Sequence, residues 1–464
     1  MIPAADIILA SLRPQLDAAA ILSGDDVDAR YGDDLASPGA ARPALVLRPR
    51  STADVSVILK TFNAAGLPLT IQGGRTGLSG AARPLAGEAV LSLERMARVE
   101  PVDALAATVV AQAGAPLQAV QEAAEAAGFS FGVDIGARGT ATVGGNIATN
   151  AGGVRVLRYG MFRQQVLGLE AVLADGAVVS SMRGLAKDNS GYDLAQIFVG
   201  SEGTLGAVTR VCLRLHPKPV EQAAAFCALP SLEAALALLR LMRGRTGPLL
   251  SAFEVILAPL YREMTEASGL DMPVGDAPVH ALVEMHGFAP EADRSVFAAA
   301  LEEALEAGLV TDAVLSRSQR EVEAFWRLRD ECSRFIFAQG PAVGLDLSLP
   351  LARLGDFLVR AEATTRALDP AARLYAFGHL GDGNIHYIAL TREHDAVSAA
   401  LHRLAAEAGG SISAEHGVGL MKKAYLPLMR SPQELAAMRR LKAAFDPNNI
   451  LNRGRIFDMT PEPG

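Results

Sequence analysis

The sequence predicts an α+β protein with a two-part N-terminal domain, a second α+β domain and a C-terminal helical tail. Its 464 residues exceed what one ordinary core accommodates. Two glycine-rich segments follow strand patterns in the first half, and strand and helix patterns alternate in the second half. We place the first domain at residues 1–219 with its core at 40–219, the second domain at 220–410, and the tail at 411–464.

The composition limits the classes of function. A formal net charge of −8 gives no electrostatic reason to expect nucleic acid or an anionic membrane as a partner. Cys212, Cys227 and Cys332 show no CxxC spacing, so we expect no disulfide framework and a reduced, cytoplasmic location. The N-terminus lacks a signal-peptide pattern, and no apolar run predicts a membrane span.

The first domain opens with a predicted βαβ unit. A strand at 44–47 precedes a helix that Ser51 caps and Gly66 ends, and the next strand lies at 68–71. Further strands are predicted at 89–92, 107–111, 166–173, 178–180 and 208–215, with a helix at 116–127.

The first glycine-rich segment, Gln72 to Gly80, follows this unit and contains four glycines in nine residues. Its backbone N–H groups can turn inward to bind an anion, with Thr76 and Ser79 as further donors. The spacing matches neither the dinucleotide fingerprint nor the P-loop, so a different nucleotide fold is needed. A tight turn between strands is the alternative interpretation.

The second glycine-rich segment, Arg138 to Gly153, alternates small residues with hydroxyls and contains almost no bulky side chain. A main chain of this kind lets a large flat ligand lie close to the backbone. A glycine-rich turn in a sheet is again the alternative, but it does not explain why bulk is avoided over so many residues.

The segment Gly378 to His386 predicts a metal-binding hairpin. With Asp382-Gly383 as a two-residue turn, His379 faces His386 across the strands. Glu415 and His416 lie further along the chain and could supply a carboxylate and an imidazole. Nitrogen and oxygen ligands of this kind suit zinc, manganese, iron or cobalt. The alternative is that each histidine is a surface or capping residue near a glycine turn.

Several segments together resemble a known family. QGGRTGLSG, GGNIATNAGG, KDNSGYDL and GSEGTLG resemble the FAD-binding domain of the vanillyl-alcohol oxidase and p-cresol methylhydroxylase superfamily. GHLGDGNIH, AEHGVG and FDPNNILN resemble its D-2-hydroxyacid dehydrogenase branch. The resemblance covers residues 40–457 and implies a two-part FAD-binding domain, an α+β substrate-binding cap and a C-terminal tail that returns to the flavin.

The resemblance also implies which residues bind FAD. They are Gly73, Gly74, Arg75, Thr76, Gly77, Gly80, Thr140, Gly144, Gly145, Thr149, Asn150, Gly153, Val208 and Asn452. Some members of the superfamily bond a histidine of the first loop covalently to the flavin. No histidine occurs between Met1 and Arg210, so we expect non-covalent FAD.

The resemblance implies that Arg329 binds the substrate carboxylate. Asn384 lies on the same face of the predicted hairpin as His386, where it can bind a carboxylate or a hydroxyl, and His416 is expected to be the general base because an imidazole titrates near the working pH. His379, His386 and Glu415 are expected to hold a divalent metal, zinc or manganese, that activates the substrate hydroxyl. Relatives that oxidise D-2-hydroxyglutarate carry a lysine where this chain has Gly344.

The expected activity is FAD-dependent oxidation of a D-2-hydroxyacid, such as D-lactate, D-2-hydroxyglutarate, D-malate or glycolate, with hydride moving from C2 to flavin N5. The electron acceptor would be an electron-transfer flavoprotein, a quinone or a cytochrome, and the chain could form a homodimer. The alternatives are a flavin-bearing electron-transfer subunit of a multi-chain complex and a metal-free alcohol oxidase.

Overall fold

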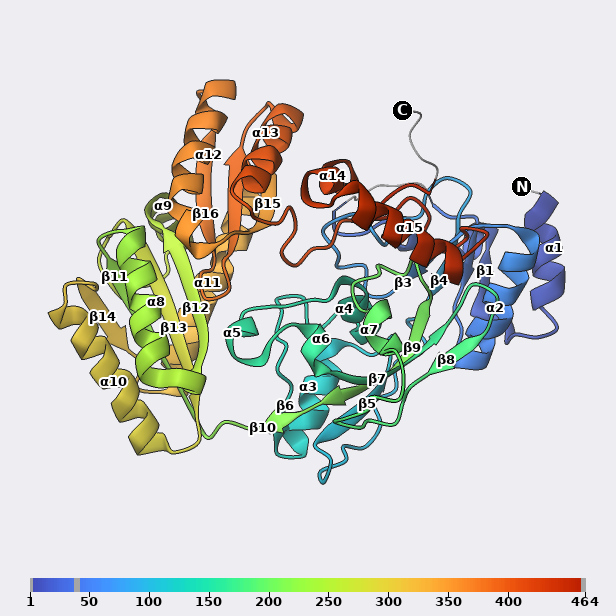
Figure 1. Ribbon diagram of the computed structural model, residues 1–464, viewed down its shortest axis with the longest axis horizontal. Coiled ribbons are helices and arrows are strands. Elements are labelled where there is room, and N and C mark those ends of the chain that lie inside the picture. The colour runs from blue at the N-terminus through green and yellow to red at the C-terminus, as the bar shows by residue number, and fades with distance from the viewer. Residues whose placement is uncertain (1–2, 37–41, 460–464) are drawn as a thin grey trace. The chain divides into compact units, whose positions relative to one another are not determined.

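The computed structural model describes residues 3–36 and 42–459, and the chain divides into two compact units (Figure 1). Unit 1 comprises residues 1–152, 161–218 and 415–464, and unit 2 comprises residues 153–160 and 219–414. The segment 153–160, which the sequence analysis assigned to the first domain, therefore groups with unit 2.

The first sheet of unit 1 forms around the predicted βαβ unit. Its strand order is β1 (Ile21–Ser23), β2 (Leu45–Leu47), β4 (Ala89–Ser92) and β3 (Leu69–Gln72), and it is accompanied by helices α1 (Pro3–Leu12) and α2 (Thr52–Ala65). β2, β4 and β3 are parallel to one another. The helix α2 connects β2 to β3, and β4 lies between these two strands in the sheet. The predicted helix ends are confirmed, because Ser51 forms a capping box with Asp54 and Gly66 is left-handed.

The second sheet of unit 1 is antiparallel. Its strand order is β5 (Thr108–Gln112), β9 (Ala207–Arg214), β7 (Val166–Val172) and β8 (Val178–Ser180), and a separate ribbon pairs β6 (Phe129–Ser130) with β10 (His216–Pro217). The helices are α3 (Leu117–Ala126), α4 (Val143–Thr149), α6 (Phe162–Gln165) and α7 (Leu194–Phe198). One continuous hydrophobic core includes residues of both sheets, so the two halves form a single domain.

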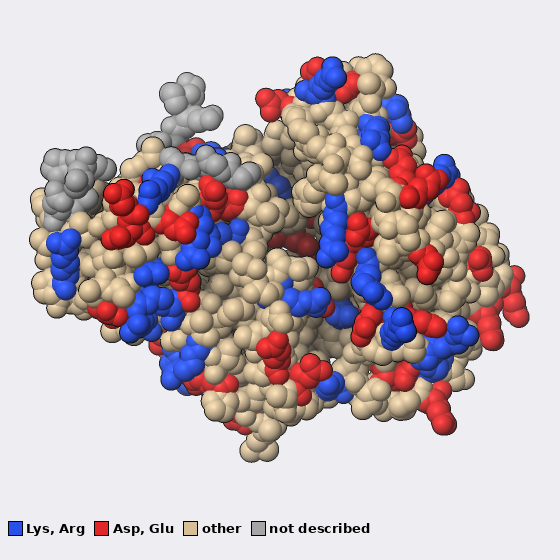
Figure 2. Space-filling view, turned by 180° about the vertical axis from the view of Figure 1, so that it is seen from behind, with Lys and Arg blue, Asp and Glu red and all other residues tan. Residues whose placement is uncertain are grey.

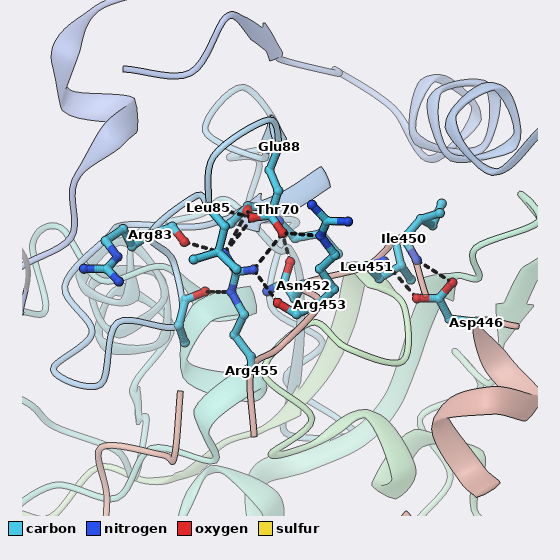
Figure 3. A network of polar contacts seen from close by, with 12 residues as sticks. Thr70, Arg83, Leu85, Glu88, Asp446, Ile450, Leu451, Asn452, Arg453 and Arg455 are labelled. Carbon is cyan, nitrogen blue, oxygen red and sulfur yellow. Dashed lines mark hydrogen bonds and ion pairs between the residues drawn. The ribbon is translucent and has the colours of Figure 1, made fainter. Parts of the chain in front are cut away.

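The C-terminal tail belongs to unit 1 from residue 415, whereas residues 411–414 group with unit 2. The tail returns to the first sheet of unit 1. After α14 (Leu426–Met429) and α15 (Pro432–Phe445), Leu451 forms a parallel bridge with Leu69. Arg455 is fully buried and makes two hydrogen bonds of 2.9 Å with the two carboxylate oxygens of Glu88 (Figure 3). Asp446 accepts hydrogen bonds from the backbone N–H groups of Ile450 and Leu451. These contacts fix the backbone on both sides of Asn452.

Unit 2 is built on a seven-stranded sheet in which all neighbouring strands are antiparallel. Its order is β14 (Asp312–Leu315), β11 (Glu221–Leu229), β13 (Val279–Gly287), β12 (Leu250–Leu257), β16 (Arg373–His379), β17 (Asn384–Leu390) and β15 (Val343–Ser348). The short helix α5 (Val156–Tyr159) also belongs to this unit.

Helices cover both faces of this sheet. One face packs on α8 (Leu232–Thr246), α10 (Pro290–Glu306), α12 (Leu354–Leu368) and α13 (His394–Glu407), and the other packs on α9 (Ala258–Ser268) and α11 (Gln319–Ala338). Because side chains alternate along each strand, each face has its own hydrophobic cluster. The predicted α+β architecture of the second domain is confirmed.

The surface carries charges of both signs. On the face drawn in Figure 2, basic and acidic side chains are interspersed. Among the helices of residues 3–36 and 42–459, none combines the length and the apolar character needed to cross a membrane.

Replacing Arg455 by Met should lower the free energy of unfolding by about 3–5 kcal/mol, because Glu88 would lose its buried bidentate partner. Urea denaturation followed by circular dichroism measures this loss. Glu125→Gln, which removes the partner of exposed Lys218, is the matched control and should leave the unfolding free energy unchanged within error. A loss below about 1 kcal/mol for Arg455→Met would contradict the role of this pair.

Candidate active site

A cavity of about 360 Å³ in unit 1 is lined by both glycine-rich segments. Of the residues expected to bind FAD, those that line it are Gly73, Gly74, Arg75, Thr76, Gly77, Gly144, Gly145, Thr149, Val208 and Asn452. Gly80, Thr140 and Asn150 are not among the lining residues, and Gly153 groups with unit 2. Sequence reasoning missed Thr142, Asn146 and Glu202, which also line the cavity.

Some of the glycines are required by close packing of the main chain. A Cβ atom added to Gly73 would lie 2.3 Å from Thr142 Oγ1, and one added to Gly74 would lie 2.1 Å from the Thr140 carbonyl oxygen. Gly77 differs, because a Cβ there would meet nothing within 4 Å. Gly73 and Gly74 therefore let the two segments approach each other, whereas Gly77 leaves open space that a ligand can fill.

The cavity offers hydrogen-bonding groups that suit a polar cofactor. Ser79 Oγ and Asn146 Nδ2 are buried and have no hydrogen-bond partner among the described residues. Such groups are costly to bury unless a ligand or water satisfies them. Arg75 adopts a left-handed backbone conformation (φ 58°) within the first segment, a conformation that occurs in the anion-binding nests of backbone N–H groups. The residues present thus fit the phosphate-bearing FAD implied by the sequence.

Asn452 joins the tail to the cavity. Its Oδ1 accepts a hydrogen bond of 2.7 Å from the backbone N–H of Ile71, and its Nδ2 donates one of 2.7 Å to the carbonyl of Glu202. Both ends of this side chain are therefore used to hold protein segments together at the cavity wall.

Glu202 is the buried carboxylate of this cavity. Its oxygens accept hydrogen bonds from the backbone N–H groups of Val418 at 2.6 Å and Gly419 at 2.8 Å. Burial raises the pKa of Glu202 to about 7, although these two donors favour the charged form. The sequence signal for this residue was its place as the one charged residue of the GSEGTLG motif, to which the sequence analysis assigned no site residue.

Glu415 and His416 line the same cavity as the glycine-rich segments. Both belong to unit 1, because the chain re-enters this unit at residue 415. An imidazole on the wall of the predicted flavin cavity is suited to take a proton from a bound substrate.

In unit 2, the histidine hairpin forms with a different register from the one predicted. His379 pairs with Asn384, and Phe377 pairs with His386, so the loop has the four residues Leu380 to Gly383 and not two. The prediction that His379 and His386 are directly opposed is therefore wrong. Because the shift is two residues, both side chains still project from one face, and their ring centroids lie 5.4 Å apart.

Polar side chains gather at one end of the sheet face that packs on α11. Cross-strand pairing places Glu254 opposite His379, His379 opposite Asn384, and Asn384 opposite Ser348. The neighbouring row pairs His386 with Asp346. The sheet therefore brings together residues from four strands that are distant in sequence.

Glu254 is a second buried residue that sequence reasoning missed. Its Oε1 lies 2.6 Å from His379 Nδ1, and its Oε2 accepts a hydrogen bond of 2.7 Å from Arg329 Nε. Burial alone would raise the pKa of Glu254, but the charges of His379 and Arg329 outweigh burial and lower it to about 2. Its partnership depends on the β12–β16 pairing, which local sequence patterns do not reveal.

An arginine on an amphipathic helix often lies on the solvent-exposed face and binds nothing, but Arg329 does not. It is 8% exposed, and its guanidinium lies 5.2 Å from the centre of the Phe377 ring. Nη2 is buried and has no hydrogen-bond partner within the part of the chain that the structure describes. A donor in this state is suited to a substrate carboxylate.

Asn384 is buried and held by its neighbours. Its Nδ2 donates to Asp346 Oδ1 and to the carbonyl of Leu347, both at 2.9 Å. Asp346 Oδ1 also lies 3.7 Å from His386 Nδ1. The Asn384 Oδ1 atom has no hydrogen-bond partner among the described residues, so the side chain can still accept a hydrogen bond.

Within residues 3–36 and 42–459, no group of three or more His, Cys, Asp or Glu side chains is arranged to hold a metal ion. The expected ligands are divided between the units, with His379 and His386 in unit 2 and Glu415 in unit 1. The metal remains a hypothesis at this point.

Comparison with known proteins decides the family. Residues 43–181 match the FAD binding domain, and residues 218–456 match the C-terminal domain of FAD linked oxidases. The chain belongs to the FAD-linked oxidase family. The chain is 40% identical over 417 residues to the mitochondrial D-2-hydroxyglutarate dehydrogenase of Bos taurus, and the alignment covers 88% of this chain and 76% of that protein.

Two further similarities agree with this assignment. The D-2-hydroxyglutarate dehydrogenase of Xanthomonas citri pv. viticola is 37% identical over 443 residues, covering 93% of each chain. The solved structure of p-cresol methylhydroxylase matches with a TM-score of 0.79 at 17% identity, covering 100% of this chain and 98% of that one, and supports the fold alone. The family expected from the sequence motifs is confirmed: the chain belongs with FAD-linked oxidases whose relatives include D-2-hydroxyglutarate dehydrogenases.

Gly74→Ala should destabilise cofactor-free unit 1 by on the order of 1–3 kcal/mol, because its Cβ would collide with the Thr140 carbonyl. Gly77→Ala is the matched control, since open space surrounds that position. It should retain the unfolding free energy of the wild type while binding FAD more weakly. Urea denaturation of the apoprotein and fluorescence titration with FAD measure the two effects. Equal apoprotein stability for Gly74→Ala and wild type would contradict the packing role.

Proposed function

We propose that this protein oxidises a D-2-hydroxyacid to the 2-oxoacid. Bound FAD would supply the acceptor for the hydride that leaves C2. The observation that carries the proposal is the position of His416 on the wall of the cavity that both glycine-rich segments line. Removing the hydroxyl proton is the costly part of the reaction at neutral pH, and an imidazole titrates near that pH. His416 is therefore assigned the role of general base.

Arg329 is assigned to the substrate carboxylate. Glu254 holds its Nε, which fixes the plane of the guanidinium while Nη2 keeps its hydrogen-bonding capacity. A charge-assisted bond from a preoriented guanidinium gives both affinity and orientation. Asn384 adds an acceptor oxygen for the substrate hydroxyl.

We further propose that His379, His386 and Glu415 hold a divalent ion, zinc or manganese. Such an ion lowers the pKa of a coordinated hydroxyl by several units. Support comes from the two rings, because the Nδ1 atom of each faces a buried carboxylate, Glu254 or Asp346. Metal-binding histidines commonly use one nitrogen for such a carboxylate and the other for the metal.

Two observations bear on the substrate: one favours D-2-hydroxyglutarate and the other does not. The relatives named above act, by their names, on D-2-hydroxyglutarate, which has a second carboxylate. Gly344 lies exposed on β15 and supplies no cation for that group. We therefore propose a substrate range that includes D-lactate, D-malate and glycolate beside D-2-hydroxyglutarate.

Two other functions are kept as alternatives. A flavin-bearing subunit of a multi-chain complex would show turnover only with its partner chains, whereas the dehydrogenase should reduce an artificial electron acceptor alone. A metal-free alcohol oxidase would leave the two histidines whose Nδ1 atoms face buried carboxylates, His379 and His386, without a role. The acceptor is proposed to be an electron-transfer flavoprotein, a quinone or a cytochrome, and the chain to form a homodimer.

Anaerobic titration of the purified protein with D-2-hydroxyglutarate, D-lactate, D-malate and glycolate tests the activity. We expect a flavin spectrum that at least one of these acids bleaches, with the L-enantiomer of any chiral substrate inactive as the matched control. A protein that lacks flavin, or whose flavin none of the four acids reduces, would refute the proposed function.

Gly344→Lys should lower the KM for D-2-hydroxyglutarate by about tenfold while changing that for D-lactate little, because a charged hydrogen bond contributes about 1.5–3 kcal/mol. A side chain fits here, since a Cβ would meet nothing within 4 Å. Gly344→Met, of similar length but uncharged, is the control. Equal changes for both acids would argue that residue 344 does not contact the second carboxylate.

Metal analysis of the purified protein should find zinc or manganese close to one ion per chain. Dialysis against a chelator should abolish flavin reduction by the substrate, and adding the ion back should restore it. His386→Ala should lose the metal, whereas His394→Ala, an exposed histidine of the same unit, should retain it. Full activity in metal-free protein would rule out the metal.

A further inference from the structure

The loop that carries Glu415 and His416 continues into a short segment, Gly417 to Met421, that is tied to the cavity wall. We propose that Glu202 is the positioning residue that holds this loop, and with it His416, against the flavin cavity. The proposal rests on the function proposed above and names a residue that acts on the reaction through another. It concerns unit 1 alone, to which all of these residues belong.

The Glu202 carboxylate binds the loop directly. One oxygen accepts the N–H of Val418 at 2.6 Å and the other accepts the N–H of Gly419 at 2.8 Å. Glu202 is 4% exposed, so these bonds form in a region of low dielectric constant where water does not compete. A carboxylate that accepts two successive backbone N–H groups fixes both the place and the orientation of that backbone.

The loop glycines fit this anchor. A Cβ on Gly417 would lie 2.7 Å from Glu202 Oε1, and a Cβ on Gly419 would lie 2.1 Å from the Ser79 carbonyl oxygen. Ser79 provides a second anchor, because its carbonyl accepts the N–H groups of Leu420 at 3.0 Å and Met421 at 3.1 Å. The loop therefore lies in contact with a residue from each of two cavity-lining segments.

Glu202 is itself held by the walls of the cavity. Its N–H donates to the carbonyl of Ala148 at 2.8 Å, and its own carbonyl accepts from Asn452 Nδ2 at 2.7 Å. Its φ angle of 50° is a strained conformation for a residue with a side chain. A strained residue held on three sides is a rigid support, so the position of the loop is set by the same segments that line the cavity.

Hydrogen–deuterium exchange of the whole protein tests the anchor without using activity. In Glu202→Gln the amide keeps one acceptor oxygen, and its NH2 group would face one of the two N–H donors. The peptide that covers residues 415–421 should therefore exchange faster than in wild type. Asp54→Asn is the matched control, because Asp54 also accepts two backbone N–H bonds, from Arg50 and Ser51, but does not line the cavity. Unchanged exchange in Glu202→Gln would overturn the proposal.

A double-mutant cycle tests whether Glu202 acts through His416. Glu202→Gln should slow flavin reduction by the substrate about tenfold to a hundredfold, as a misplaced catalytic group does. In a His416→Ala background the same substitution should change the rate less than about threefold, because the positioned group is absent. A loss of the same factor in both backgrounds would mean that Glu202 does not act through His416, and would overturn the proposal.

A second variant covers the case in which Glu202→Gln does not fold. Gly417→Ala pushes its Cβ against Glu202 Oε1 and should give the same faster exchange and the same dependence on His416. If no D-2-hydroxyacid reduces the wild-type flavin, the proposed function fails, while the exchange experiment still decides whether the anchor exists.

Discussion

The cavity of unit 1 depends on main chains that approach each other too closely for side chains to intervene. Gly74 lies against the Thr140 carbonyl, and Gly144 lies against Ala113, where a Cβ would be 2.7 Å from the Ala113 Cβ. Gly419 meets Ser79 in the same way. These contacts make much of the cavity wall out of backbone, so the positions of its backbone hydrogen-bond donors are set by the fold and not by rotamers. A wall of this kind is preorganised for its ligand.

Buried carboxylates orient the groups that are proposed to act on the substrate. Glu254 contacts both His379 and Arg329. Asp346 accepts a hydrogen bond from Asn384 and lies near His386. Glu202 accepts hydrogen bonds from the backbone that follows His416. Each carboxylate comes from a different element, β12, β15 or the loop after α7. In a region of low dielectric constant such contacts are strong, and breaking one leaves a buried charge uncompensated. These contacts orient the side chains of Arg329, His379 and Asn384, and they fix the backbone next to His416.

The sequence allowed prediction of features whose causes are local. The capped helix α2 and the two glycine-rich segments could be predicted because Ser51, Gly66 and the glycines act on their own neighbourhood. The hairpin register could not, since Asp382-Gly383 occurs equally well inside a four-residue loop. Glu254 and Glu202 were missed because their partners come from a neighbouring strand and from a loop more than two hundred residues away. Long-range pairing decides such partnerships, and no local pattern encodes it.

The central claim is that a C2–H bond of a D-2-hydroxyacid breaks as the flavin is reduced. The most direct measurement is anaerobic stopped-flow mixing of the FAD-loaded protein with the preferred acid, either unlabelled or deuterated at C2. We expect the flavin absorbance to disappear more slowly with the deuterated acid than with the unlabelled acid. The difference between the two rates should be larger the more C–H cleavage limits the observed rate. Equal rates at every concentration of acid, in a step shown not to be limited by binding, would contradict the account.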